Sequence, residues 1–274
     1  MTATGNYAIH GGVSGRERLR VLGRVMAAPT AALLDRVGVH DGHACIDVGC
    51  GGGDASLELA WRASPSGSVV GLDLDGVKLQ IAREEAARRG VKNLEFRHAD
   101  FREFAADAAY DVVYARFLLT HLSDPAAAVQ SFFRCLRPGG MVAVEDIDFS
   151  GMFTHPPSPA TQRYIELYCA TVRNRGADPN IGPRLPSLLI DAGFDEVGVA
   201  VVQPVGLTGE AKLLNPLTMQ GITDAVLADG LASQAEIDQL VADLFAFAEN
   251  PYTLAGLPRV VQAWGRRPAS APST

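Results

Sequence analysis

The sequence predicts an α/β fold: a doubly wound, mostly parallel sheet of seven strands, with helices on both faces and added helical cap segments. Three observations lead to this prediction. Between residues 45 and 148, short apolar runs alternate with segments of helical apolar spacing, which is the pattern of βαβ units. A glycine-rich turn follows the first apolar run. Beyond residue 150, loops rich in proline and glycine separate longer helical segments.

Two helices are expected ahead of the first strand. Residues 16–27 carry leucines at helical spacing. Pro29 is expected to end this helix, because proline has no amide hydrogen and clashes with the preceding turn. Residues 30–37 are expected to form the second helix. We expect residues 1–40 together to be an N-terminal helical segment that acts as a lid.

Each expected strand is a short apolar run bounded by turn residues. The seven runs are residues 45–49, 68–73, 94–100, 110–116, 141–148, 196–205 and 258–267. The helices between them carry recognisable end signals. Asp54 and Asp75 are placed to cap two helices, and Gly90 is placed to end the second of these. Strands and crossover helices in this order predict a parallel sheet.

The chain is expected to divide into a core and an insertion. Residues 41–206 and 258–267 should form the sheet core. Residues 207–257 join the last two strands and show helical apolar spacing, so we expect a helical cap over an acceptor pocket. Such helices would bury themselves equally well in a dimer surface. Residues 268–274 are expected to be a disordered tail.

Composition narrows the class of protein. The chain has 274 residues and a net charge of −7. It has no dense Lys/Arg cluster, so no nucleic-acid partner is expected. No apolar run has the length of a signal peptide or a membrane span, so a cytoplasmic protein without a membrane partner is expected. The four cysteines form no Cys-x-x-Cys pair, so neither disulfides nor a metal site are expected.

The stretch CIDVGCGGGDAS, residues 45–56, indicates a ligand site. Four glycines within five positions let a ligand approach the backbone at the carboxyl end of a strand. A dinucleotide motif would need glycine where Asp54 stands, and a phosphate-binding loop would need Gly-Lys-Ser/Thr. The pattern therefore favours a ligand without phosphates. S-adenosylmethionine, with its ammonium, carboxylate and sulfonium, is such a ligand.

The segment from Asp47 to Gly53, DVGCGGG, resembles the first motif of class I S-adenosylmethionine-dependent methyltransferases. Four later segments resemble further motifs of this family: HADF, YDVVYARFLLTHLSDP, LRPGGMVAVED and AGF. The resemblance covers residues 43–200 and the last strand. It implies a Rossmann-like fold that binds S-adenosylmethionine and releases S-adenosylhomocysteine.

The resemblance also implies a cofactor site. Asp73, at the end of the second strand, would accept hydrogen bonds from both ribose hydroxyls, and Leu74 would pack on the adenine. Asp100 would receive the adenine amino group beside Phe101. Asp47 would hold the methionine ammonium, directly or through the loop. The full set of implied cofactor residues is Asp47, Gly49, Cys50, Gly51, Asp73, Leu74, Asp100, Phe101, Arg116 and Phe117.

Two residues are candidates on the acceptor side. His121 follows the fourth strand and could act as a base, or it could pack structurally under the cap. Tyr7 belongs to a segment that resembles the N-terminal cover of small-molecule methyltransferases. A base is needed only if the acceptor must lose a proton.

The predicted function is methyl transfer to a small molecule, on oxygen, nitrogen or carbon, with a place in secondary metabolism as one option. One alternative is a methyltransferase fold that binds cofactor or ligand without transferring methyl. A nicotinamide-dependent oxidoreductase is a weaker alternative, because Asp54 and Asp100 do not suit it. A homodimer or higher homo-oligomer remains open.

Overall fold

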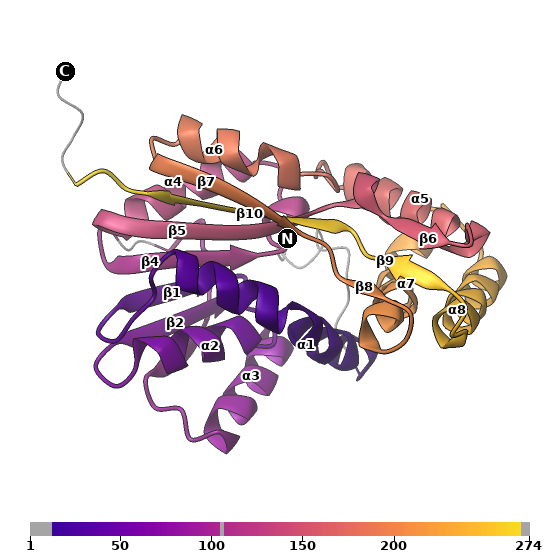
Figure 1. Cartoon of the computed structure of the whole chain (residues 1–274), viewed down its shortest axis with the longest axis horizontal. Helices are drawn as coiled ribbons and strands as arrows, with labels where there is room; N and C mark the ends of the chain where they lie inside the picture. The colour runs from indigo at the N-terminus through magenta and orange to yellow at the C-terminus, as the bar shows by residue number, and fades with distance from the viewer. Residues whose placement is uncertain (1–12, 105–106, 270–274) are drawn as a thin grey trace.

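The computed structural model of the chain describes residues 13–104 and 107–269. Seven strands form one sheet in the order β3-β2-β1-β4-β5-β10-β7 (Figure 1). All neighbours are parallel except β10, which runs antiparallel to both β5 and β7. The strands are β1 (Ala44–Val48), β2 (Ser68–Asp73), β3 (Leu94–His98), β4 (Tyr110–Arg116), β5 (Leu136–Asp148), β7 (Asp195–Val202) and β10 (Arg259–Arg266). The predicted doubly wound, mostly parallel sheet of seven strands is confirmed.

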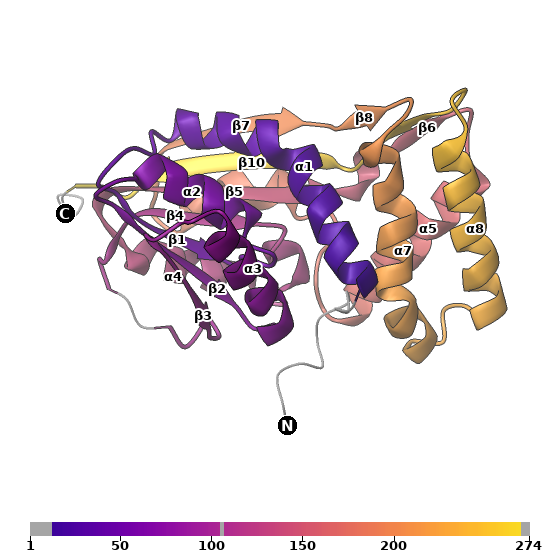
Figure 2. The same ribbon diagram turned by 90° about the horizontal axis from the view of Figure 1, so that it is seen from below.

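Helices cover both faces of this sheet (Figure 2). On one face lie α1 (Val13–Arg36), α2 (Asp54–Ala63) and α3 (Gly76–Arg88), and on the other α4 (Pro125–Cys135) and α6 (Leu185–Asp191). Leu34 and Leu59 pack with Val112 on the first face, and Phe132 packs with Val144 on the second. Because both faces are covered, the central strands are nearly continuous apolar runs rather than alternating ones.

A helical cap lies beyond the end of β5 (Figures 1 and 2). It consists of α5 (Pro159–Asn174), α7 (Glu210–Ala228) and α8 (Gln234–Glu249). Their apolar faces form a second core around Tyr168, Ile222 and Leu240, which Met26 of α1 joins. An apolar core of this kind holds the cap against the N-terminal helix and the end of the sheet.

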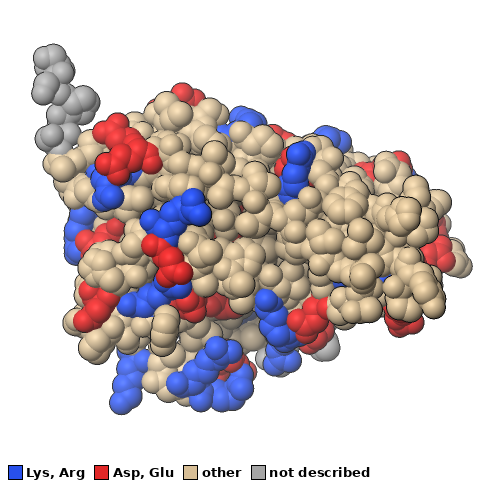
Figure 3. Space-filling model, in the orientation of Figure 1, with Lys and Arg blue, Asp and Glu red and all other residues tan. Residues whose placement is uncertain are grey.

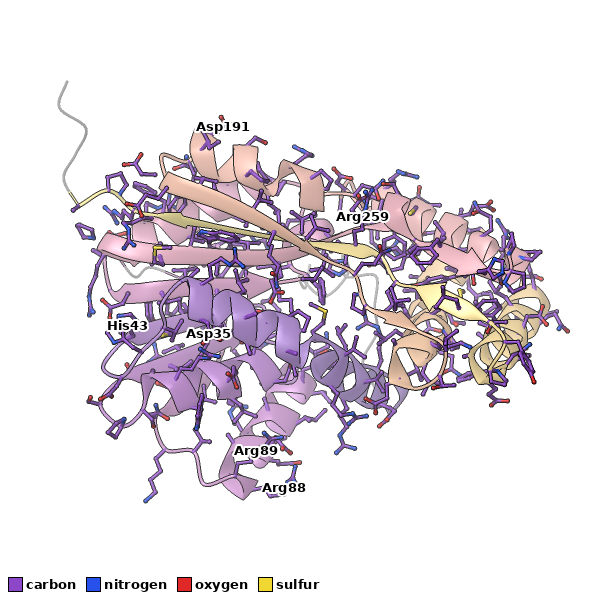
Figure 4. The ribbon with its side chains drawn as sticks, in the orientation of Figure 1. Asp35, His43, Arg88, Arg89, Asp191 and Arg259 are labelled. Carbon is purple, nitrogen blue, oxygen red and sulfur yellow. The ribbon has the colours of Figure 1, made fainter. Side chains whose placement is uncertain are left out.

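A small antiparallel sheet connects the cap to the large sheet. Its strands are β6 (Phe153–His155), β9 (Leu254–Gly256) and β8 (Val205–Gly206), in that order. Sequence patterns did not predict it, because strands of two or three residues are too short to show periodicity. At this junction Arg259 of β10 donates to the Asp148 carboxylate over 2.7 Å. Figure 4 labels Arg259 between the large sheet and the cap.

The prediction that Pro29 ends the first helix is wrong: α1 continues through it to Arg36. Contacts distant in sequence hold this stretch. The side-chain amide of Gln262 donates to the carbonyl of Pro29 over 3.0 Å. Met26 and Leu33, on either side of the proline, are both buried in the core. Proline removes one hydrogen bond from the helix, and this loss alone predicts that the helix ends there. The tertiary contacts of this stretch offset the loss.

Two other local predictions differ from the structure. Asp54 does not cap α2: the cap position belongs to Gly53, and the Asp54 carboxylate pairs with Arg116. The fifth strand begins at Leu136, five residues before its predicted start, because Leu136 already pairs with Tyr110. The capping role predicted for Asp75 is confirmed, since its carboxylate accepts from two amides in the first turn of α3.

The surface differs between the two ends of the molecule. Figure 3 shows charged side chains gathered over the part that contains α2 and α3, whereas the face over β8 and β9 is largely uncharged. Val199, Val201 and Val205, from β7 and β8, are exposed apolar side chains. Within residues 13–104 and 107–269, none of the helices combines the length and apolar character needed to cross a bilayer.

The carboxylate of Glu145 connects three elements inside the core. Glu145 is fully buried on β5. It accepts hydrogen bonds from the Thr30 hydroxyl of α1 (2.7 Å), the Tyr114 hydroxyl of β4 (2.5 Å) and the Gln262 amide of β10 (2.7 Å). A buried carboxylate is tolerated when donors satisfy its oxygens. This network fixes the middle of α1 to the sheet.

Replacing Glu145 by alanine is expected to lower the free energy of unfolding by about 3 kcal/mol, because three buried donors lose their acceptor. Urea denaturation measures the change. Glu166→Ala is the matched control, since the Glu166 side chain on α5 is 52% exposed and should change stability by less than about 0.5 kcal/mol. Equal effects of the two substitutions would contradict the conclusion that the Glu145 network fixes α1 to the sheet.

Candidate active site

A cleft of about 570 Å³ opens at the carboxyl ends of β1, β2 and β4, beneath α1. Ligands of doubly wound sheets bind at this edge. The cleft brings together most of the residues that the sequence singled out: Asp47, Gly49, Cys50, Gly51, Asp73, Arg116, Phe117 and His121 all line it. Tyr7 lies outside the described residues.

The glycine-rich loop forms the floor of the cleft. Gly49, Gly51 and Gly53 have φ values of +74°, +53° and +80°, a region that side chains other than glycine rarely adopt. A Cβ at Gly53 would also lie 2.7 Å from the ring of Phe96. The amide of Gly49 donates to the carbonyl of Leu72 over 2.8 Å. The glycines are thus required by backbone conformation, and Gly49, Gly51 and Gly52 line the cleft without side chains.

Asp73 is positioned by the backbone around it. One carboxylate oxygen accepts from the Gly51 amide and the other from the Asp75 amide, each over 2.8 Å. Each oxygen of a carboxylate can accept a second hydrogen bond. Asp73 is half-buried and lines the cleft, so its remaining acceptor positions are available to a pair of hydroxyls.

Asp47 is the buried acid of the cleft. Its carboxylate accepts from the Ser56 hydroxyl over 2.5 Å. Burial raises the pKa of Asp47 to about 7, and the Ser56 hydrogen bond offsets only part of that shift. A nearby ligand cation would favour the carboxylate form of Asp47.

Two cations of the cleft are paired with carboxylates. Arg116 donates to the Asp54 carboxylate over 2.5 Å and to the Thr30 hydroxyl over 3.1 Å. Lys78 lies 3.6 Å from the Asp75 carboxylate. Such mixed charge suits a zwitterionic ligand with a cationic sulfur better than a pyrophosphate.

Three of the predicted cofactor residues lie outside the lining of the cleft. Leu74 is 43% exposed. Asp100 accepts from the Arg102 side chain, whose hydrogen bonds lower the pKa of that carboxyl. Phe101 packs toward Phe132, with 5.9 Å between ring centroids. The adenine contacts assigned to these residues remain predictions.

A second cavity of about 600 Å³ lies between α1, α5, α7 and the end of β5. We call it the acceptor chamber. Its wall is aromatic and aliphatic: Phe149 stacks on Tyr168 with 4.2 Å between ring centroids, and Tyr164 lies beside them. Met26 and Ile147 also contribute apolar surface. An apolar enclosure with few polar groups is typical of a small-molecule site.

The two cavities meet. Arg18, Leu22, Phe117 and His121 line both of them. Phe117 has a φ of +53°, rare for an aromatic residue, and its amide donates to the Glu145 carbonyl over 2.8 Å. Backbone conformations of this kind cluster at functional sites. Phe117 and His121 therefore stand between the cofactor cleft and the acceptor chamber.

His121 ends the short 3-10 helix η2 (Leu119–His121). Burial, together with the positive charges of Arg18 and Lys78, lowers the pKa of His121 to about 3. The imidazole is therefore neutral at physiological pH. A group this weakly basic is a poor proton acceptor near pH 7; the role of catalytic base for His121 stays a prediction.

Sequence patterns missed Arg18, Lys78 and the aromatic wall of the chamber. Local periodicity identified their helices but not which side chains face a ligand. Burial raises the pKa of the Cys50 thiol well above its ordinary value, so this cysteine is not a thiolate nucleophile. Within the described part of the chain, no group of three or more His, Cys, Asp or Glu could hold a metal ion.

Comparison with known proteins defines the class. The model of a family described as a methyltransferase domain matches residues 39–180, just over half of the chain. The chain therefore belongs to the methyltransferase family, and the predicted membership of class I S-adenosylmethionine-dependent methyltransferases is confirmed.

Curated relatives agree with this class. The chain is 28% identical over 233 residues to the "Uncharacterized 37.1 kDa protein in transposon TN4556" of Streptomyces fradiae, covering 82% of this chain and 65% of that protein. It is 31% identical over 170 residues to phosphoethanolamine N-methyltransferase 1 of Triticum aestivum, covering 61% and 31%. It is 37% identical over 114 residues to the ubiquinone biosynthesis O-methyltransferase of Leptothrix cholodnii, covering 41% and 47%. The chain spans less than two thirds of the length of each of these relatives.

Solved structures share the fold. The chain superposes on phosphoethanolamine N-methyltransferase 2 of Haemonchus contortus with a TM-score of 0.58 and 16% identity, covering 92% of this chain and 58% of that one. It superposes on the [4+2]-cyclase SpnF with a TM-score of 0.56 and 18% identity, covering 94% and 96%. At these identities the likeness establishes the fold alone.

His121 is expected to stay neutral in the folded protein from pH 8 to pH 5. Ring nitrogen shifts in NMR, assigned by their loss in His121→Gln, measure this. The urea-unfolded chain is the control, because there the ring should titrate near its ordinary pKa of 6.5. Since only the unfolded chain takes up this proton below pH 6.5, the contribution of His121 to stability falls as the pH falls. A folded-state midpoint above pH 5.5 would contradict the assignment.

Proposed function

We propose that this protein transfers a methyl group from S-adenosylmethionine to a small-molecule acceptor held in the acceptor chamber. The observation that carries the proposal is the meeting of two cavities at Phe117 and His121. One cavity has the glycine loop and the acid of a nucleoside site. The other is apolar and enclosed by the cap. A methyltransferase needs this juxtaposition, because it must align two bound molecules.

The residues of the cleft fit the cofactor. The Asp73 carboxylate would accept the ribose hydroxyls, and the loop at Gly49 and Gly51 leaves space for the methionine portion. Asp47 would hold the ammonium. Cys50 would contribute its backbone, since its thiol is not ionised. When bound, S-adenosylmethionine supplies an electrophilic methyl group on a cationic sulfur.

The chain's own contribution is positioning and the exclusion of water. Phe117 and Leu22 form apolar surface where the cavities meet. His121 is neutral there and can exchange hydrogen bonds without taking a proton at pH 7. With His121 neutral, an acceptor that is nucleophilic as bound needs no base at this junction. Relatives named as N- and O-methyltransferases support a small acceptor, and the methylated atom stays open.

Two finer predictions concern the assembly of the protein and its biological role. Exposed Val199, Val201 and Val205 support the prediction of a homo-oligomer, since apolar patches often mark contacts between chains. A role in secondary metabolism remains a prediction.

A second candidate is a ligand-binding or cyclising protein that keeps the fold without methyl transfer. A [4+2]-cyclase has the same fold, and one fold can serve different reactions. Incubation with S-adenosylmethionine and fractionated small-molecule extracts, followed by mass spectrometry, separates the two. A product 14 mass units heavier, formed with S-adenosylhomocysteine, supports transfer; conversion without cofactor consumption supports the second candidate.

Asp73→Ala is expected to weaken the binding of S-adenosylhomocysteine about 10–100-fold, because two hydroxyls lose charged acceptors. Isothermal titration calorimetry measures the affinity, and an NAD titration in parallel is expected to show no binding. Glu95→Gln is the matched control, since this carboxylate pairs with Arg97 on the surface of β3. Unchanged affinity in Asp73→Ala would remove the ribose assignment.

A further inference from the structure

Arg18 places a positive charge in the wall of the acceptor chamber. It lies on α1, is half-buried, and lines both cavities. Its Nε atom donates to the Thr218 hydroxyl of α7 over 3.0 Å. This hydrogen bond fixes the guanidinium between the N-terminal helix and the cap. An arginine fixed in this way is preorganised for an oxygen anion.

Among the described residues, no carboxylate pairs with this charge: Asp47, Asp54 and Asp73 of the cofactor cleft bond to other groups. None of the residues that line the chamber in the described structure is Asp or Glu. Arg18 forms no salt bridge within residues 13–104 and 107–269, unlike Arg116, which pairs with Asp54. A partly buried cation without a counter-charge is costly unless a ligand supplies one.

We propose that Arg18 anchors an anionic oxygen of the acceptor, and that the acceptor is an apolar, ring-bearing molecule with one such oxygen. The proposal rests on the proposed function, because it concerns the acceptor of that same site. A carboxylate, phenolate or enolate would each supply the oxygen. The stacked rings of Phe149 and Tyr168 provide a flat apolar wall for the remainder of the molecule.

The surroundings of Arg18 favour the acceptor over the carboxylate of the cofactor. Its hydrogen-bond partner, Thr218, lines only the chamber, as does Tyr164. The charge of Arg18 acts on the Tyr164 hydroxyl, where it opposes the rise in pKa caused by burial. A cationic amine is disfavoured as acceptor, because it would meet a like charge in an apolar enclosure.

Two fluorescent probes isolate the charge. 8-Anilinonaphthalene-1-sulfonate and N-phenyl-1-naphthylamine share their aromatic rings, and only the first carries an anionic group. In titrations of the full chain, Arg18→Met is expected to weaken binding of the sulfonate about 10–100-fold. Binding of the neutral amine should change less than about twofold. Arg18→Lys should restore part of the sulfonate affinity, because it keeps the charge but not the planar fork.

Three controls test whether the variants stay folded and whether the effect is specific to Arg18 and to the acceptor chamber. Arg20→Met, a substitution on the same helix at a side chain that is 55% exposed, should leave both probe affinities unchanged. Near-ultraviolet circular dichroism and urea midpoints of the variants must match the parent, because loosened cores also bind such probes. S-adenosylhomocysteine affinity, measured by calorimetry, should fall much less than the sulfonate affinity in Arg18→Met, although Arg18 also lines the cofactor cleft.

The outcomes separate the two proposals. Equal losses for both probes, no loss for either, or failure of the sulfonate to bind the parent protein would overturn the anionic-acceptor assignment. A loss confined to S-adenosylhomocysteine would also overturn it and place Arg18 in the cofactor site. None of these results bears on methyl transfer itself, which the product assay tests. Absence of S-adenosylhomocysteine binding in the parent would instead remove the proposed function.

Discussion

The buried carboxylate of Glu145 determines where the N-terminal helix lies. Its hydrogen bonds to Thr30, Tyr114 and Gln262 connect α1 to two strands of the sheet. A carboxylate in the core needs all its donors, because an unsatisfied charge costs several kcal/mol there. The helix is therefore held in one position across the strand ends. Both cavities depend on that position, since α1 forms part of the wall of each.

Close packing extends this constraint to the ligand sites. Along α1, Gly23 passes so near Asp54 that an added Cβ would lie 3.0 Å from that carboxylate. Leu19 lies over Gly51 and Gly52. Farther toward the N-terminus, Arg18 reaches Thr218 of the cap. One helix thus covers the glycine loop and closes the chamber, so that a ligand in either cavity contacts the same element.

Sequence patterns predicted the parts that depend on neighbours in the chain. The succession of strands along the chain follows from short apolar runs, and the glycine corner follows from the crowding of glycines at residues 49–53. The rest depends on contacts between distant residues. The course of α1 through Pro29 requires Gln262, and the paired state of Arg116 requires Asp54. Arg18 had no local signal at all, because an arginine in a helix is ordinarily a solvated side chain.

The two cavities differ in how their charged side chains are paired. In the cofactor cleft, Arg116 and Lys78 have carboxylate partners and Asp73 is held by backbone amides. In the chamber, the charge of Arg18 has no such partner among the described residues, and His121 is neutral. With His121 neutral, the described part of the site is expected to act through orientation and through the charge state of what it binds.

A crystal structure of the protein with S-adenosylhomocysteine tests this account most directly. The ribose hydroxyls are expected within hydrogen-bond distance of Asp73, and the sulfur is expected to face the junction at Phe117 and His121, open to the acceptor chamber. A ribose bound away from Asp73, or a sulfur separated from the chamber by closed protein, would contradict it.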